Sequence, residues 1–118
     1  MDKREFVAAI RSEVLEDAVA SVKSNLNAPP GRKLSERMIR LSTWYNNLDE
    51  SNKSIVLEIV RESADTSVFG FFCVLDGVRS IESNDKGVLK LYHEKEHSTV
   101  LLNNEDQEYL HDILNEES

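Results

Sequence analysis

The N-terminal segment carries the apolar periodicity of one long helix, and this pattern restricts the fold more than any other feature. Over residues 2–26, apolar side chains recur mostly every three or four positions among charged ones. These side chains are Phe6, Val7, Ile10, Val14, Ala18, Val22 and Leu26. The helix must end before Pro29-Pro30-Gly31, because prolines lack a backbone donor and impose extended geometry on the preceding residue. We therefore predict one helix over 2–26, followed by a break too short to separate domains.

Two more helical patterns follow the break. Ser35 can cap the first of them, whose apolar stripe is formed by Leu34, Met38, Leu41, Trp44 or Tyr45, and Leu48. Asp49 opens the next predicted helix, in which Ile55 and Ile59, with Val56 and Val60 as further candidates, face the core.

The most apolar stretch, residues 68–78, fits either a buried helix or a buried strand. Asp65, Thr66 and Ser67 can cap a helix there, and Gly70 and Gly77 lie seven residues apart, where a second helix could approach closely. The aromatic and β-branched content favours a strand instead. We predict a separate helix over 68–78.

The C-terminal part of the chain predicts a hairpin and a last helix. After the turn-rich residues 82–87, strands are expected over 88–93 and 98–102, joined through residues 94–97. Asn104 can cap the last helix with Gln107 in a capping box, and its buried stripe is Tyr109, Leu110, Ile113 and Leu114. The predicted class is α+β, with about five helices and one antiparallel hairpin in a single domain over residues 1–118.

Composition places the chain among small globular proteins. Its 118 residues are 40% hydrophobic and 31% charged, which suits one core. The single cysteine, Cys73, cannot form an internal disulfide, and the first residues do not form a signal peptide. The longest apolar run, residues 68–75, is far below the roughly 20 residues of a membrane-spanning helix. We therefore expect a cytoplasmic protein with no membrane partner.

Negative charge is concentrated towards the C-terminus. Residues 1–47 contain eight Lys or Arg and six Asp or Glu, whereas residues 48–118 contain six and sixteen, within a net charge of -8. Such a field repels nucleic acid and attracts basic partners. We therefore expect a non-enzymatic module that binds a basic protein partner. The candidate contacts are two aromatic anchors and four acids: Tyr92, Tyr109, Glu94, Glu105, Glu108 and Asp112.

Four short stretches resemble a small bacterial family. They are Trp44-Tyr45-Asn46-Asn47, residues 59–65, Phe69-Gly70-Phe71 and residues 75–79, so the resemblance covers about residues 44–115. In size, acidity and make-up the chain is similar to bacterial toxin-immunity proteins, which bind and block a partner toxin. The resemblance implies a toxin domain as the basic partner, and it transfers no functional residue.

The alternative to a binding module is a small metal-dependent hydrolase. The string from His93 to His97 matches the H-E-x-x-H zinc pattern, in which two His on one helical turn hold the metal and the Glu is the general base. The flanking residues predict strands, which would remove that helical geometry. His111, Glu116 and Glu117 are the downstream candidates for a third ligand. We expect a solvated hairpin tip, and assign no metal and no cofactor.

Three other features of the sequence are candidates for sites. Cys73 has apolar neighbours that raise a thiol pKa, so it is predicted to pack in the core. Asp76 interrupts an apolar run and would need a partner such as Arg79 or an arginine from another helix. Four cations form a basic cluster at the start of the second predicted helix: Arg32, Lys33, Arg37 and Arg40. This cluster is interpreted as a solvated face, a contact with the acidic half of the chain or a phosphate-binding patch. If the helix begins early enough, Lys33, Arg37 and Arg40 lie along one side of it.

Overall fold

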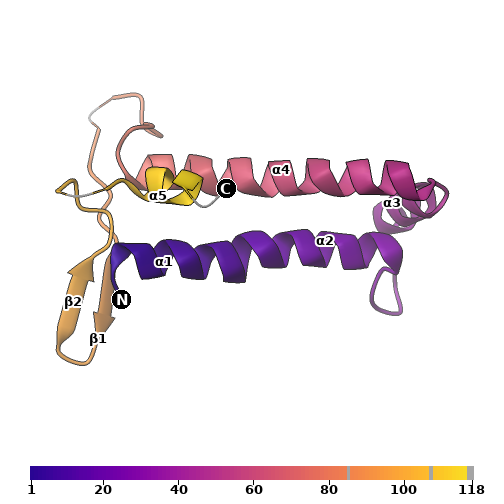
Figure 1. Cartoon of the computed structure of the whole chain (residues 1–118), viewed down its shortest axis with the longest axis horizontal. Coiled ribbons are helices and arrows are strands. Elements are labelled where there is room, and N and C mark those ends of the chain that lie inside the picture. Colours follow the sequence, from indigo (N-terminus) through magenta and orange to yellow (C-terminus); the bar gives the residue numbers. More distant parts are fainter. Residues whose placement is uncertain (85, 107, 117–118) are drawn as a thin grey trace. The chain divides into compact units, whose positions relative to one another are not determined.

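The computed structural model describes residues 1–84, 86–106 and 108–116, and it confirms the long N-terminal helix (Figure 1). Three segments follow one another without a break: α1 (Lys3–Ile10), the π-helical η1 (Arg11–Glu16) and α2 (Asp17–Asn27). The helix begins at Asp2, whose carboxylate accepts the backbone N–H of Glu5 at 2.8 Å. It ends at Asn27, two residues before the prolines that were predicted to stop it.

The second and third helices also start where the sequence predicts. Ser35 caps α3 (Glu36–Asn46) by accepting the N–H of Met38 at 3.1 Å. Asp49 caps α4 (Glu50–Leu75) by accepting the N–H of Asn52 at 2.8 Å. These two polar side chains each satisfy a backbone donor that the first helical turn leaves free.

The separate helix predicted over 68–78 is wrong, because α4 continues through residues 65–67 to Leu75. No proline interrupts this stretch, and a single glycine within a helix costs only about 1 kcal/mol. Counting α1, η1 and α2 as one, the described residues form four helices rather than about five. Gly77, with φ of 77°, ends α4: its N–H bonds to Val74 and that of Val78 bonds to Cys73, a Schellman motif.

The predicted antiparallel hairpin is present with shorter strands. β1 (Tyr92–Lys95) pairs with β2 (Ser98–Leu101), so that Lys95 faces Ser98 across a two-residue turn. The four-residue connection over 94–97 was therefore wrong. Glu96, with φ of 53°, takes the left-handed conformation that so tight a turn requires.

The last helix, α5 (Leu110–Glu116), begins six residues later than the predicted Asn104 cap. The side chain of Asn104 instead donates to the carbonyl of Leu101 at 3.2 Å. Gln107, its predicted capping partner, lies outside the described residues. Helices make up 61% of the described residues beside one hairpin, which confirms the α+β class.

The chain divides into two compact units, unit 1 (residues 1–14 and 66–118) and unit 2 (residues 15–65). The single domain expected over residues 1–118 stays a prediction. Within the described ranges, every helix is too short or too polar to serve as a membrane span.

The core of unit 1 lies where α1, the end of α4 and α5 meet. Phe6 of α1 packs on Phe72 of α4 with ring centroids 5.9 Å apart. The predicted stripe of the last helix is largely confirmed, since Leu110, Ile113 and Leu114 are fully buried, as is Val7 of α1. Burial of these side chains holds the short α5 in place, because a seven-residue helix is not stable alone.

In unit 2, α3 packs on the end of α2 through its Ser42 and Tyr45 face. Ser42 donates its hydroxyl to the carbonyl of Leu26 at 2.8 Å, and Tyr45 is buried. Leu41, a predicted member of the apolar stripe, is 45% exposed, and of the alternatives Trp44 and Tyr45 it is Trp44 that is exposed, at 55%. The core-facing prediction for Ile55 and Ile59 is also wrong, since both are exposed.

Candidate functional site

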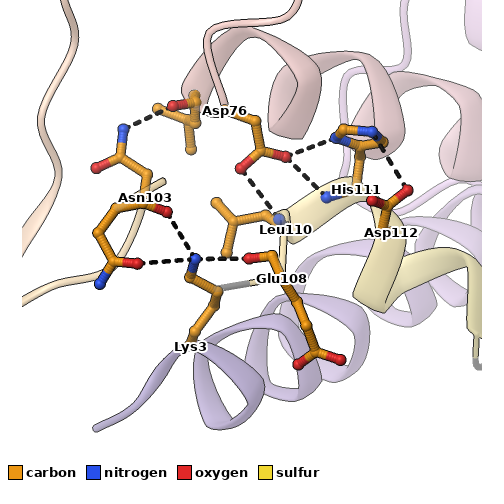
Figure 2. Close-up of polar contacts among 9 residues, drawn as sticks. Lys3, Asp76, Asn103, Glu108, Leu110, His111 and Asp112 are labelled. Carbon is orange, nitrogen blue, oxygen red and sulfur yellow. Dashed lines mark hydrogen bonds and ion pairs between the residues drawn. The ribbon is translucent and has the colours of Figure 1, made fainter. Parts of the chain in front are cut away.

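Asp76, directly after α4, is the centre of a buried polar cluster in unit 1 (Figure 2). One carboxylate oxygen accepts the N–H of Leu110 at 3.0 Å, and the other accepts the N–H of His111 at 2.9 Å. These are donors of the first turn of α5, so Asp76 caps a helix that begins 34 residues later. The arginine partner expected for Asp76 is absent from its described contacts; backbone donors and a histidine replace it.

The imidazole of His111 completes this cap. Its Nδ1 lies 2.7 Å from a carboxylate oxygen of Asp76, and it acts as the donor because a carboxylate only accepts. The ring stacks on Tyr109 at 5.4 Å and meets the edge of Phe69 at 5.5 Å. His111 is therefore held on three sides, and its side chain is only 15% exposed.

Lys3 and Asn103 fix the segment between the hairpin and α5. The Lys3 ammonium donates to the carbonyls of Asn104 and Glu108 at 2.8 and 2.6 Å (Figure 2). Asn103 donates to the carbonyls of Leu75 and Leu89 at 2.6 and 2.8 Å. No sequence pattern predicts these roles of Lys3 and Asn103, because neither residue belongs to a motif. The one sequence signal for a buried polar site is the isolated acid Asp76.

The chemistry of this cluster is structural. Across the part of the chain that the structure describes, every buried side-chain nitrogen and oxygen has a hydrogen-bond partner. A network in which every buried polar atom has a partner holds its residues in place, because breaking one bond would leave a buried group unpaired. Asp76, Lys3 and Asn103 therefore fix the framework on which the surface of unit 1 is presented.

The candidate zinc string lies on the hairpin. His93 and Glu94 belong to β1, where neighbouring side chains point to opposite faces, and His97 lies in the turn. No three His, Cys, Asp or Glu side chains among the described residues are grouped so that they could hold a metal ion. Glu117, a candidate third ligand, falls outside the described residues, and His111 is engaged by Asp76.

Cys73 is buried in α4, as predicted for a core residue. Burial raises the pKa of its thiol, with a further rise from the charge of Asp76 and an opposing effect from Arg79. A raised pKa leaves little thiolate near neutral pH, which is the opposite of what a nucleophilic cysteine needs.

The six predicted partner-binding residues all belong to unit 1 and differ in accessibility. Tyr92 is 51% exposed and lies on the same face of β1 as the exposed Glu94. Glu105 is exposed, and the Asp112 side chain is 60% exposed with one oxygen 3.4 Å from His111 Nε2. Tyr109 is half-buried against His111.

Glu108 is already paired within the unit. Its carboxylate binds the guanidinium of Arg4 through both oxygens, and Arg4 also contacts Glu116 at 3.1 Å. These two carboxylates raise the pKa of Arg4, with the Glu108 hydrogen bond as the larger cause. Glu108 is therefore less available to an external cation than Glu94 or Glu105, neither of which has a partner among the described residues.

Negative charge lies mainly in one of the two units. Unit 1 contains seven Lys or Arg and fourteen Asp or Glu, whereas unit 2 contains seven and eight. Most of the net charge of -8 therefore belongs to unit 1. We define the acidic surface of unit 1 as the exposed acids of residues 94–106 that have no described partner, together with Tyr92: these acids are Glu94, Glu96, Glu105 and Asp106.

Unit 1 also has an open cavity of about 460 Å³ between the end of α4 and the segments 79–90 and 101–106. Its wall includes the apolar Ile81, Val88 and Leu89, and its charged residues have both signs. Glu105 and Asp106 line one part, whereas Arg79, Lys86 and Lys90 belong to the segment 79–90. Such a mixed lining selects no single ligand charge.

The basic cluster lies entirely on the surface of unit 2. Arg32 and Lys33 precede α3, because the helix starts at Glu36, and so Lys33 does not align with Arg37 and Arg40 as an earlier start would have allowed. All four cations are exposed, and the described residues provide no ion-pair or hydrogen-bond partner for any of them.

No family model matches this chain, and neither a curated protein nor a solved structure is significantly similar to it.

Proposed function

We propose that this chain is a non-enzymatic protein-binding module that takes a basic protein partner on the acidic surface of unit 1. The observation that carries the proposal is the placement of charge: unit 1 has twice as many acids as Lys and Arg together, and four exposed acids of residues 94–106 have no described partner. Acids without internal partners keep their charge for an external cation. A toxin domain, as in immunity-type inhibitors, is the partner class that we propose.

The buried cluster supports this function by holding the surface in one shape. Lys3 ties α1 to the carbonyls of Asn104 and Glu108, and these flank Glu105 and Asp106. Asp76 fixes the start of α5 immediately afterwards. A pre-organised segment loses less conformational entropy on binding, so more of the contact energy remains as affinity.

Charge and apolar contact have separate roles in the proposed complex. The negative field of unit 1 steers a cationic partner and accelerates association. Lasting affinity needs a desolvated anchor, and Tyr92 is the best candidate because it is half exposed beside Glu94. Tyr109 has one ring face covered by His111, which makes it the weaker anchor.

A capture experiment with two charge-reversed variants tests the proposal. The acid variant carries Glu94→Lys, Glu105→Lys and Asp106→Lys on unit 1. The matched control carries Asp17→Lys, Glu58→Lys and Glu62→Lys at exposed positions of unit 2, with the same change in net charge. We expect the wild type and the control to retain one basic protein from an extract of the source cells, and the acid variant to lose it.

Kinetics with the captured protein complete the test. Its association rate should fall several-fold as ionic strength rises past about 0.15 M, where the Debye length is about 8 Å. Tyr92→Ala should mainly accelerate dissociation. Equal binding by the acid variant and the control, or an association rate that ignores salt, would show that the acidity serves only solubility.

A further inference from the structure

One face of α3 in unit 2 is left uncovered by the packing of that unit. Met38, Ser42 and Tyr45 turn towards the rest of unit 2: Ser42 and Tyr45 are buried, Met38 is half-buried, and Ser42 donates to Leu26. Arg37, Arg40, Leu41 and Trp44 follow the i, i+3, i+4, i+7 spacing of a single helix side and are all exposed. We call these four residues the outer face of α3.

The side chains of the outer face are those that form anchors in protein interfaces. Trp and Arg dominate binding hot spots, and this short stretch holds two Arg and, one turn further along the helix, the chain's one Trp. Trp44 is 55% exposed and Leu41 is 45% exposed, although both belong to a stripe that would ordinarily be buried. The face therefore combines a cationic N-terminal part with an apolar C-terminal part.

The cations around this face have no described partner, in contrast to the two arginines that form ion pairs elsewhere in the described residues. Arg61 binds both carboxylate oxygens of Glu16 at 2.8 Å, and Arg4 is held by Glu108 and Glu116. Arg37 and Arg40, with the preceding Arg32 and Lys33, have no such partner in the described ranges. A surface of this kind fits an acidic patch that also offers an aromatic contact.

The chain itself supplies a surface of that chemistry. The acidic surface of unit 1 presents Glu94, Glu105 and Asp106 without described partners, together with the half-exposed ring of Tyr92. Nucleic acids and anionic membranes suit the arginines equally well, but the net charge of -8 opposes their approach to the whole molecule. A second copy of the chain is repelled by the same net charge, but that charge is unevenly distributed. The acidic unit 1 of one copy can therefore approach the nearly neutral unit 2 of the other.

We propose that the outer face of α3 in one copy docks on the acidic surface of unit 1 in a second copy. Because the two surfaces differ, the contact is heterologous and leaves one free surface at each end of the pair, so association is open-ended or closes into a ring. The inference rests on the acidic surface of the proposed function. It adds a regulatory consequence: self-association covers that surface until a basic partner displaces the second copy.

Sedimentation velocity of the full chain over about a hundredfold range of concentration tests this inference. We expect the mean mass to rise with concentration at low salt and to return towards that of the monomer near 1 M salt, where the Debye length is about 3 Å. The single Trp44 gives a second readout at the contact. Its fluorescence emission should shift to shorter wavelength as association covers the indole.

Two variants that each remove one side of the contact make the test specific. The α3 variant carries Arg37→Glu, Arg40→Glu and Trp44→Ala, and the acid variant is the one defined above; each alone should remain monomeric. An equimolar mixture should form a one-to-one pair and nothing larger, because every pair retains one intact interface. Formation of the mixed pair also shows that both variants are folded.

A matched control separates local contact from overall charge. Lys23→Glu with Lys86→Glu gives the same net charge as the α3 variant but leaves the outer face intact, and this variant should still associate. A wild type that stays monomeric, or a mixture that does not pair, would overturn the inference. Binding of anionic vesicles or RNA through Arg37 and Arg40 without self-association would overturn it as well. A monomeric wild type that still captures a basic protein through Glu94, Glu105 and Asp106 would leave the proposed function standing.

Discussion

Replacing Asp76 by Asn should destabilise unit 1 strongly, although the two side chains have nearly the same size. One carboxylate oxygen accepts from Leu110 N–H, and the other accepts both from His111 N–H and from His111 Nδ1. The asparagine side chain has only one acceptor oxygen, and its NH2 group would face the N–H donors of Leu110 or His111. At least one bond to a charged acceptor is lost, at about 1.5–3 kcal/mol, and a facing pair of donors is created.

We therefore expect Asp76→Asn to lower the free energy of unfolding by about 3 kcal/mol, a large share of the roughly 5–15 kcal/mol typical of a small domain. Urea unfolding followed by circular dichroism measures this loss. Hydrogen exchange at the Leu110 and His111 amides should accelerate in parallel, because these are the capped donors. Asp106→Asn is the control, since its exposed side chain has no described partner.

The reasoning fails if Asp76→Asn costs less than about 1 kcal/mol, a loss no greater than that of an ordinary exposed cap. It fails equally if the exchange of Leu110 and His111 is unchanged while the protein as a whole is destabilised. The first result would mean that the three hydrogen bonds add little beyond solvation. The second would place the effect of Asp76 somewhere other than the start of α5.

Three further predictions concern the end of α4. Phe72→Ala should cost about 3–5 kcal/mol in urea unfolding, because Phe72 is fully buried against Phe6. Gly77→Ala should lower stability by about 1–2 kcal/mol in the same assay, since φ of 77° is strained for a residue with a Cβ. Because burial raises the pKa of Cys73 above its ordinary 9.0, an aromatic disulfide reagent at pH 8 should react far more slowly with the native than with the urea-unfolded protein. The thiol pKa of Cys73 is higher in the folded than in the unfolded protein, so its contribution to stability is fully present below the unfolded-state pKa. This contribution is lost as the pH rises through the folded-state pKa, and Cys73→Ala should abolish that pH-dependent loss of stability.

Local signals were sufficient for most helix starts and stops. Ser35 and Asp49 cap the helices that they were predicted to cap, because each bond joins groups only three residues apart. Pro29 and Pro30 end the first helix through their own covalent geometry. The polar residues 65–67 misled the prediction, since a residue able to cap a helix can equally well continue one.

For the partner-binding residues, the sequence predicts only that the surface is acidic, not which acids are free to bind. Excess acid predicts a basic partner from the sequence alone, but the pairing of Glu108 with Arg4 joins residues 104 positions apart. Likewise, the periodicity that marks Leu41 and Trp44 as apolar cannot say which side of α3 meets a neighbour. Here the polar Ser42 takes the buried side because its hydroxyl reaches the carbonyl of Leu26.

Sequence information was enough to predict the class of the fold, the break at Pro29 and Pro30 and the sign of the surface charge, because these depend on propensities, covalent geometry and counts that need no contact between distant residues. Tertiary structure alone decided that Asp76 begins α5 and that Lys3 fixes the residues before it. It also decided which acids and arginines remain without a partner. These pairings join groups that are distant in the chain. They form because an unpaired polar group is costly once it is buried, and burial depends on the tertiary structure.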